Sequence, residues 1–200
     1  ALHRANGGAL GTEAEKAVLD HVRLCAAFVR DNLERDLQFN HLMKNLVALS
    51  VYSAGLASPP TSFAFLRDAV PRSIGQCVLP DGGHVERSPM YHKLALIDLR
   101  VLRDSGLFGE VLDDPIARME TALAAMCHAD GDIALFNDSW LGEGPAALTL
   151  IDPGPVARLT DTGYVRLGGG GDVVLFDCGA CGPDATPAHA HADFLSIEAS

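Results

Sequence analysis

The sequence is poor in basic residues and has no long apolar run. Its 200 residues include 15 Lys and Arg against 26 Asp and Glu, which gives a net charge of −11. Because no basic stripe is present to neutralise phosphates, nucleic acid is excluded as an expected partner. No run of eighteen apolar residues occurs, so we expect no membrane-spanning helix.

Hydrophobic residues nevertheless make up 48% of the chain, enough to bury a core in one domain or two small ones. Helical spacing of these residues predicts five helices in the first three-quarters. We expect the first to begin at a capping box, Thr12 to Glu15, and the fourth at Ser88-Pro89. The predicted ranges are 12–33, 41–54 closed by Gly55, 61–78 interrupted by Pro71, 88–106, and from Asp114-Pro115 to near Gly131.

Two similar segments suggest an internal repeat. "PDGGHVE" (80–86) and "ADGDIAL" (129–135) each follow a predicted helix, and their Asp-Gly pairs are 49 residues apart. A period of this size, with one helical hairpin in each repeat, suits α/α hairpins stacked in a solenoid or toroid.

The pattern changes after Pro155. "TGYVRL" (162–167), "DVVLFD" (172–177) and "DFLSIEA" (193–199) have the composition of short strands, and "GGGG" (168–171) is typical of a hairpin turn. The sequence therefore predicts an α+β protein with a helical portion at 1–157 and the first strands of a β domain at 158–200. Because three strands make a poor independent sheet, we expect the chain to be a fragment of a longer protein.

The stretch "DGGHVERSPMYH" (81–92) gathers proton-transfer and charge-binding groups at a helix start. Ser88 is a suitable N-cap and Pro89 fits the first helical position, which puts Tyr91 and His92 in the first turn. Two further clusters are Asn40-His41 and "HAHAD" (189–193). In a strand, His189 and His191 would point to one side. Two polar residues on an exposed edge strand are the structural alternative.

Four segments together resemble a known family. "FNHLMKNLVAL", "LPDGGHVERSPMYHKLALIDL", "DGDIALFNDS" and "GPDATPAHAHADFLSIEAS" occur in the order found in heparinase II/III-type polysaccharide lyases, which include alginate and oligoalginate lyase relatives. The resemblance runs from about residue 30 to the C-terminus. It implies an incomplete (α/α) toroid followed by an antiparallel β-sandwich, and either a periplasmic or a cytoplasmic location in a bacterium.

The same resemblance assigns residues to roles. Asn40 and His41 match the family's Asn-His pair, Tyr91 its tyrosine and His189 its histidine, all catalytic. His191 matches a position that binds a structural zinc ion in some members, although the chemistry itself needs no cofactor. We also expect His84, Glu86, Arg87 and Asn137 to contact the substrate, an acidic oligo- or polysaccharide.

These residue types suit β-elimination from a uronate. Asn40 and His41 would donate hydrogen bonds to the carboxylate, whose charge grows as the C5 proton leaves. Tyr91 is a poor base unless a cation such as Arg87 stabilises its phenolate. In glucuronate or mannuronate, one Tyr would act as base and then acid. In iduronate or guluronate, His189 would take the proton while Tyr91 protonates the leaving oxygen.

Three alternatives stay open. Cys178-x-x-Cys181 with His189 and His191 has the residue types of a zinc site, although the His-x-His spacing is too tight for a finger. The other three cysteines suit an apolar core. A non-catalytic uronate-glycan-binding protein on the same scaffold is the second alternative. A purely structural helical repeat is the third, and it leaves the polar clusters unexplained.

Overall fold

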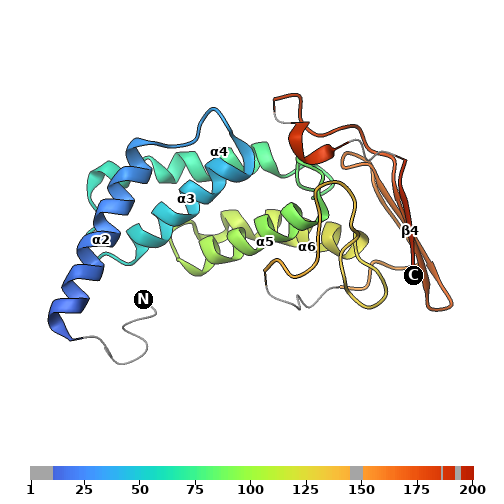
Figure 1. Ribbon diagram of the computed structural model, residues 1–200, viewed down its shortest axis with the longest axis horizontal. Helices are drawn as coiled ribbons and strands as arrows, with labels where there is room; N and C mark the ends of the chain where they lie inside the picture. The colour runs from blue at the N-terminus through green and yellow to red at the C-terminus, as the bar shows by residue number, and fades with distance from the viewer. Residues whose placement is uncertain (1–10, 145–150, 186, 192–194) are drawn as a thin grey trace.

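The chain folds into a helical part followed by an antiparallel sheet. The computed structural model describes residues 11–144, 151–185, 187–191 and 195–200. Figure 1 shows the helices side by side, with the sheet at the end farthest from α2. The α+β fold class predicted from the sequence is confirmed. Among the helices of the described residues, none has the length and apolar character needed to cross a bilayer.

Among the described residues, five α-helices build the N-terminal part. Leu96, Leu99 and Leu102 are all buried and recur every three residues on the side of α5 that faces the core. Leu46 and Met119 join the same core from the neighbouring helices. The helices are α2 (Thr12–Asp31), α3 (Phe39–Ala54), α4 (Leu66–Cys77), α5 (Pro89–Asp104) and α6 (Asp113–Ala125), with short 3-10 turns η1 (Thr61–Phe63) and η2 (Gly109–Leu112).

Helix α2 begins at Thr12 as predicted, but the N-caps predicted from the sequence are confirmed at α5 only. Ser88 caps α5 and accepts a hydrogen bond from the Tyr91 backbone N–H at 3.3 Å. The capping box at Thr12 is wrong, because the N-cap of α2 is Gly11 and Thr12 is already helical. The cap at Asp114 is also wrong, because α6 begins one residue earlier without a side-chain cap. Acidic residues in both first turns still favour these helix starts.

Other helix boundaries differ by a few residues. Helix α3 begins at Phe39 rather than His41, and α6 ends at Ala125 rather than near Gly131. Pro71 lies inside α4 and does not interrupt it. Pro71 has no backbone N–H to donate to the carbonyl of Arg67, four residues earlier. Because Arg67 is exposed, water can bond that carbonyl instead.

The predicted repeat has a structural counterpart. An isolated antiparallel bridge joins Val78 to His84 after α4, and another joins Cys127 to Ile133 after α6. Cys127 lies 49 residues after Val78, and Ile133 lies 49 residues after His84. This is the same spacing as that between the two Asp-Gly motifs. Gly82 and Gly131 supply the positive φ angles, 88° and 92°, that these turns need. The loops therefore repeat together with the helices that precede them.

In the described part of the chain, the sheet contains four antiparallel strands in sequence order, β1 (Val156–Leu159), β2 (Tyr164–Gly169), β3 (Asp172–Asp177) and β4 (Ile197–Ala199). Gly169 pairs with Asp172, which leaves Gly170 and Gly171 as a two-residue turn with positive φ at both positions. The sequence missed β1, which spans the predicted boundary between residues 157 and 158. Part of the predicted final strand, 193 and 194, lies outside the described residues.

One face of the sheet packs on α6. Leu159, Tyr164, Val173 and Leu175 are buried and form a second apolar cluster with the small side chains at the end of α6, among them Ala122. Alternate residues of β3 are buried, as expected for a sheet covered on one side. The sheet is thus fixed to the helical part by a core of its own.

Asp81 adds a polar connection between the two parts. Its carboxylate accepts from the backbone N–H groups of Asp161 and Thr162, both at 2.7 Å, and from the Thr162 hydroxyl at 2.8 Å. Although burial opposes its ionisation, these hydrogen bonds and one from Gly83 lower the pKa of Asp81. The loop before α5 is therefore held against the β1–β2 turn.

Gly83 has no room for a side chain in this connection. A Cβ at Gly83 would overlap the buried Thr162 side chain, whereas a Cβ at Gly75, an exposed position of α4, would meet nothing within 4 Å. We expect Gly83→Ala to lower the free energy of unfolding by about 1–3 kcal/mol. Gly75→Ala should instead raise it by about 0.5–1 kcal/mol, because Ala is the better helix former. Urea unfolding of both variants checks this, and equal effects would contradict it.

Candidate functional site

Three side chains from distant parts of the sequence meet beside the start of α5. Asn40 lies in the first turn of α3, Tyr91 in that of α5, and His189 in the short helix η3 (Pro187–Ala190). The ring centroids of Tyr91 and His189 are 4.0 Å apart, and Asn40 Nδ2 is 3.3 Å from His189 Nε2. Figure 1 shows η3 beside the loop that leads into α5. All three side chains are half-buried.

Asp138, which the sequence analysis did not single out, lies behind His189. Its Oδ2 is 2.8 Å from His189 Nδ1, and its backbone N–H donates to the His189 carbonyl at 2.9 Å. Because a carboxylate only accepts, this contact puts the ring proton on Nδ1 and leaves a lone pair on Nε2. We name Asn40, Tyr91, Asp138 and His189 the Tyr91 cluster.

The environment of Tyr91 favours its protonated form. Burial raises the pKa of the phenol above its ordinary value of 10.0, and nearby carboxylates add to the shift. In order of decreasing effect, those carboxylates belong to Asp138, Glu86 and Glu143. The sequence analysis named Arg87 as a cation that could stabilise a phenolate. In the structure the Arg87 guanidinium donates to the backbone carbonyls of Ala180 and Asp161 instead.

Glu86 and His84 lie beneath the cluster rather than on an open surface. Each side chain is 1% exposed. Glu86 Oε2 accepts from Asn40 Nδ2 at 2.7 Å, which fixes the orientation of the Asn40 amide. His84 and Glu86 were both predicted to contact the substrate. In the structure both are buried, and Glu86 positions Asn40. Asn40, His84 and Tyr91 also line a closed space of about 40 Å³, with Lys44 paired to Asp98 on its wall.

His84 and His92 form a buried neutral pair. The His84 backbone N–H donates to His92 Nδ1 at 3.1 Å, and His92 Nε2 donates to the Met119 carbonyl at 2.9 Å. Burial lowers the pKa of His84 to about 3 and that of His92 to about 4, and the charges of His92 and His189 add to the shift of His84. The contact between His84 and Glu86, 3.8 Å, is accordingly not an ion pair near neutral pH.

These two histidines should make the protein less stable in mild acid. Their folded pKa values lie below the unfolded value of 6.5, so the unfolded chain binds more protons between about pH 6.5 and 4. The free energy of unfolding should fall as the pH falls through this window, by about 2 kcal/mol for each histidine at pH 5. Urea unfolding at pH 7 and pH 5 measures the difference. Equal stability at the two pH values would contradict the assignment.

Arg87 and Asn137 connect the site to the sheet. Arg87 Nη1 donates to the Ala180 carbonyl at 2.7 Å, and Nη2 donates to the Asp161 carbonyl at 3.2 Å. Asn137 Nδ2 donates to the Arg87 carbonyl at 3.0 Å and to Asp177 Oδ2 at 3.0 Å. Both were predicted to bind substrate. In the structure they instead hold the loops that carry Glu86 and Asp138.

His41 is turned away from Asn40. Its Nδ1 is 3.4 Å from Glu34 Oε1, and its side chain is 46% exposed. Successive residues of an α-helix are rotated by about 100°, which separates the two neighbouring side chains. The structure thus brings three of the four predicted catalytic side chains together, and His41 contacts Glu34 instead.

Strained backbone surrounds the cluster. Gln38 and Phe39 before Asn40, Arg87 after Glu86, and Asn137 before Asp138 all have positive φ angles between 31° and 57°. Such angles cost non-glycine residues about 1–3 kcal/mol each, and they occur most often where a functional site fixes the chain. The strain supports the choice of this cluster as the candidate site.

The metal predicted at His191 has an incomplete set of ligands here. His191 Nε2 is 3.6 Å from Asp138 Oδ1. Within the described ranges, no group of three or more His, Cys, Asp or Glu side chains is arranged to hold a metal ion. Cys178 donates its thiol to the Gly163 carbonyl. A structural zinc ion stays a prediction.

Residues 151–200 match the family model described as heparinase II/III-like, C-terminal. FtsZ-localized protein C of Caulobacter vibrioides (strain NA1000 / CB15N) is 36% identical over an alignment of 139 residues, and the match covers 63% of this chain and 23% of that protein.

Solved structures share the fold over most of the chain. Heparan sulfate lyase HepC from Pedobacter heparinus has a TM-score of 0.63 at 17% identity and covers 92% of this chain and 34% of its own. Heparinase III has a TM-score of 0.70 at 15% identity and covers 87% of this chain and 35% of its own. The chain thus spans about a third of these structures and less than a quarter of the curated relative.

Helices followed by an antiparallel sheet, with an Asn, a Tyr and a His converging where they meet, define a protein with the toroid and β-domain fold of heparinases. The resemblance to the heparinase II/III-type family that the sequence motifs indicate is therefore confirmed.

Proposed function

We propose that this chain carries the reacting groups of a polysaccharide lyase that cleaves a uronate-containing glycan by β-elimination. One observation carries the proposal. The Tyr91 ring packs at a tilt against His189, whose Nδ1 is held by Asp138 and whose Nε2 faces Asn40. A uronate lyase needs a base for the C5 proton, an acid for the leaving oxygen and a donor for the carboxylate. The Tyr91 cluster contains one group of each kind.

His189 is the base in this mechanism. Its Nε2 lone pair takes the C5 proton, and the electron pair of the C–H bond forms the C4–C5 double bond. Asp138 stabilises the resulting imidazolium through Nδ1, as the carboxylate of a Ser-His-Asp triad does. Asn40 donates to the substrate carboxylate, whose negative charge spreads while the proton leaves. Glu86 accepts one of the two Asn40 N–H groups and so orients the other toward the reacting side.

Tyr91 is the acid. Its raised pKa keeps the hydroxyl protonated at neutral pH, so it is ready to give a proton to the leaving C4 oxygen as the C4–O bond breaks. Two different groups then act on C5 and on the leaving oxygen. This division of roles suits uronates whose C5 hydrogen and C4 oxygen lie on opposite faces, such as iduronate and guluronate.

A panel of four uronate glycans tests the proposal. The product's C4–C5 double bond is conjugated with the carboxylate and absorbs ultraviolet light, so turnover is followed directly. We expect iduronate- or guluronate-containing glycans to be cleaved at least tenfold faster than glucuronate- or mannuronate-containing ones. This difference is smaller than the rate increase of about 10²- to 10⁴-fold that a positioned base supplies. A preference for the second pair would overturn the roles of His189 and Tyr91. No turnover of any member would overturn the lyase.

The second candidate is a protein that binds a uronate glycan without cleaving it and serves in assembly. The relative whose printed name describes localization with FtsZ favours this candidate, because it is 36% identical over most of this chain. Binding of the same glycans measured by calorimetry, with no change in absorbance over hours, would support it. Turnover abolished by a change at Tyr91 would reject it.

A further inference from the structure

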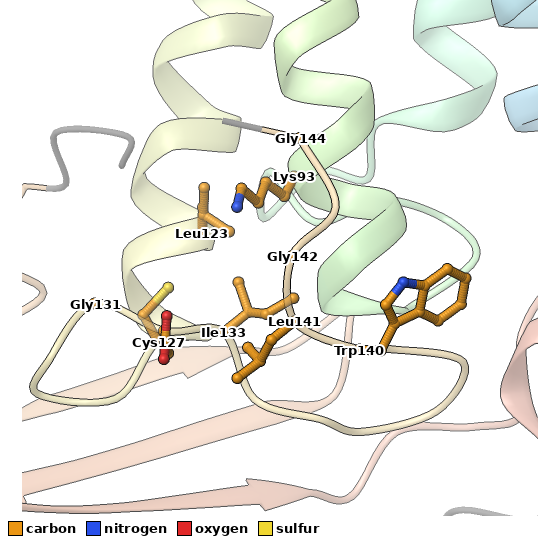
Figure 2. A pocket seen from close by; sticks show the side chains of 10 residues that line it. Lys93, Leu123, Cys127, Gly131, Ile133, Trp140, Leu141, Gly142 and Gly144 are labelled. Atoms are coloured by element: carbon orange, nitrogen blue, oxygen red, sulfur yellow. The ribbon is translucent and has the colours of Figure 1, made fainter. Parts of the chain in front are cut away.

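A larger cavity lies on the other side of α5 from the Tyr91 cluster. Lys93 follows Tyr91 by two residues, and a rotation of about 200° turns the two side chains to opposite sides of the helix. The cavity measures about 170 Å³ and is bounded by α5, the end of α6, the loop of the second bridge and residues 140–144. Figure 2 shows Lys93 and Leu123 on one wall, with Trp140 and Leu141 on the segment opposite.

Lys93 brings a positive charge to this cavity, whose lining also includes the Asp132 carboxylate. Figure 2 shows its ammonium extending from α5 toward Leu123, over the cavity. Within the part of the chain that the structure describes, no carboxylate lies within ion-pair distance of it. Lys93 is half-buried, so part of its hydration is already lost. An anionic group entering the cavity would gain a charge-assisted hydrogen bond there.

The remaining lining suits a polyhydroxylated ring. Trp140 and Leu141 offer apolar surface, and the Asp132 carboxylate accepts from hydroxyl groups. Gly142 and Gly144 expose backbone polar groups without side chains to cover them. The volume is below the 300–1,000 Å³ of pockets for drug-sized ligands, so the ligand is about one ring in size.

We propose that this cavity, the Lys93 pocket, is a second binding site, for a single acidic sugar unit whose carboxylate or sulfate contacts Lys93. The proposal does not depend on turnover in the Tyr91 cluster. The two sites are close, because the segment that carries Asp138 continues to Trp140, and Ser139 Oγ accepts from the Met90 backbone N–H at 3.1 Å. Variants must therefore distinguish one site from the other.

Trp140 is the one tryptophan of the sequence and reports directly on the Lys93 pocket. Its fluorescence would be titrated with sodium glucuronate, glucose 6-sulfate, glucose and leucine. We expect a saturable change with the first or second compound, with a Kd on the order of 1 mM for so small a ligand. The compound that binds with the lower Kd shows whether the pocket prefers a carboxylate or a sulfate. Glucose tests the need for charge, and leucine tests a zwitterion that would contact both Lys93 and Asp132.

Variants locate the response. Lys93→Met keeps the length of the side chain and should weaken binding at least tenfold, whereas Lys93→Arg should retain it. Asn40→Ala removes the amide that would hold a carboxylate in the Tyr91 cluster and should leave the Kd of the Lys93 pocket unchanged, and thermal melting checks that each variant is folded. An equal response to glucose or leucine, no response to either acid, or a response lost in Asn40→Ala but kept in Lys93→Met would each overturn the proposal. Absence of lyase turnover would leave it standing.

Discussion

Tyr91→Phe should reduce kcat by about 10²- to 10⁴-fold, the usual contribution of a positioned acid or base. The change removes only the hydroxyl, and the ring can still pack against His189 at the observed 4.0 Å between centroids. Because the lost atom acts on the leaving oxygen in the transition state, KM should change little. Initial rates on the best uronate glycan, followed by ultraviolet absorbance, measure both constants.

Tyr52 offers a matched control for this substitution. Its ring packs against Phe63 at 5.6 Å between centroids, on the far part of α3 from Asn40. Tyr52→Phe removes the same atom and should leave kcat within about twofold, since surface changes outside special sites cost less than 0.5 kcal/mol. If Tyr91→Phe kept more than about a tenth of the wild-type kcat, Tyr91 would not be the acid.

Elements with strong local signals were predicted well. The Ser88-Pro89 start of α5 and the Gly170-Gly171 turn between β2 and β3 follow from single residues whose conformational preferences leave little choice. Strand β1 was missed because four residues with little alternation give no clear period, and pairing with β2 rather than propensity makes it a strand. The Thr12 cap failed because Gly11 is also an acceptable N-cap.

The site was less accessible to sequence reasoning. Asp138 stands directly after Asn137, yet only the folded chain shows that Asp138 is the one that reaches His189. Glu86 was expected to contact the substrate, but its side chain is buried, and Asn40 supplies the hydrogen bond that this burial requires. His41 was paired with Asn40 because the two match the family's Asn-His pair, whereas a helix separates neighbours and joins residues three or four apart. Motif order locates the cluster, and packing decides which atoms face the substrate.

The position of His189 depends on residues of both parts of the molecule. It lies on η3, after the first three strands, while Asn40 and Tyr91 belong to the helical part. Asp138 on the connecting segment bonds both its ring and its backbone carbonyl. Loss of Asp138's charge therefore affects the proton position on the ring, while the backbone hydrogen bond still holds η3 in place.

Asp138→Asn should lower kcat by about 10²- to 10⁴-fold with little change in KM, although Asp138 is a positioning residue that does not contact the substrate. The amide can donate to Nδ1 as well as accept, so the ring proton can move to Nε2 and block the lone pair that takes the C5 proton. Nitrogen NMR of the His189 ring would show this change of tautomer, which a merely structural role would not produce. Asp104→Asn, at an exposed side chain near Arg103, is the matched control and should leave rate and spectrum unchanged. A variant at Asp138 that lost activity while the ring proton stayed on Nδ1 would show that the carboxylate acts in some other way than by orienting the base.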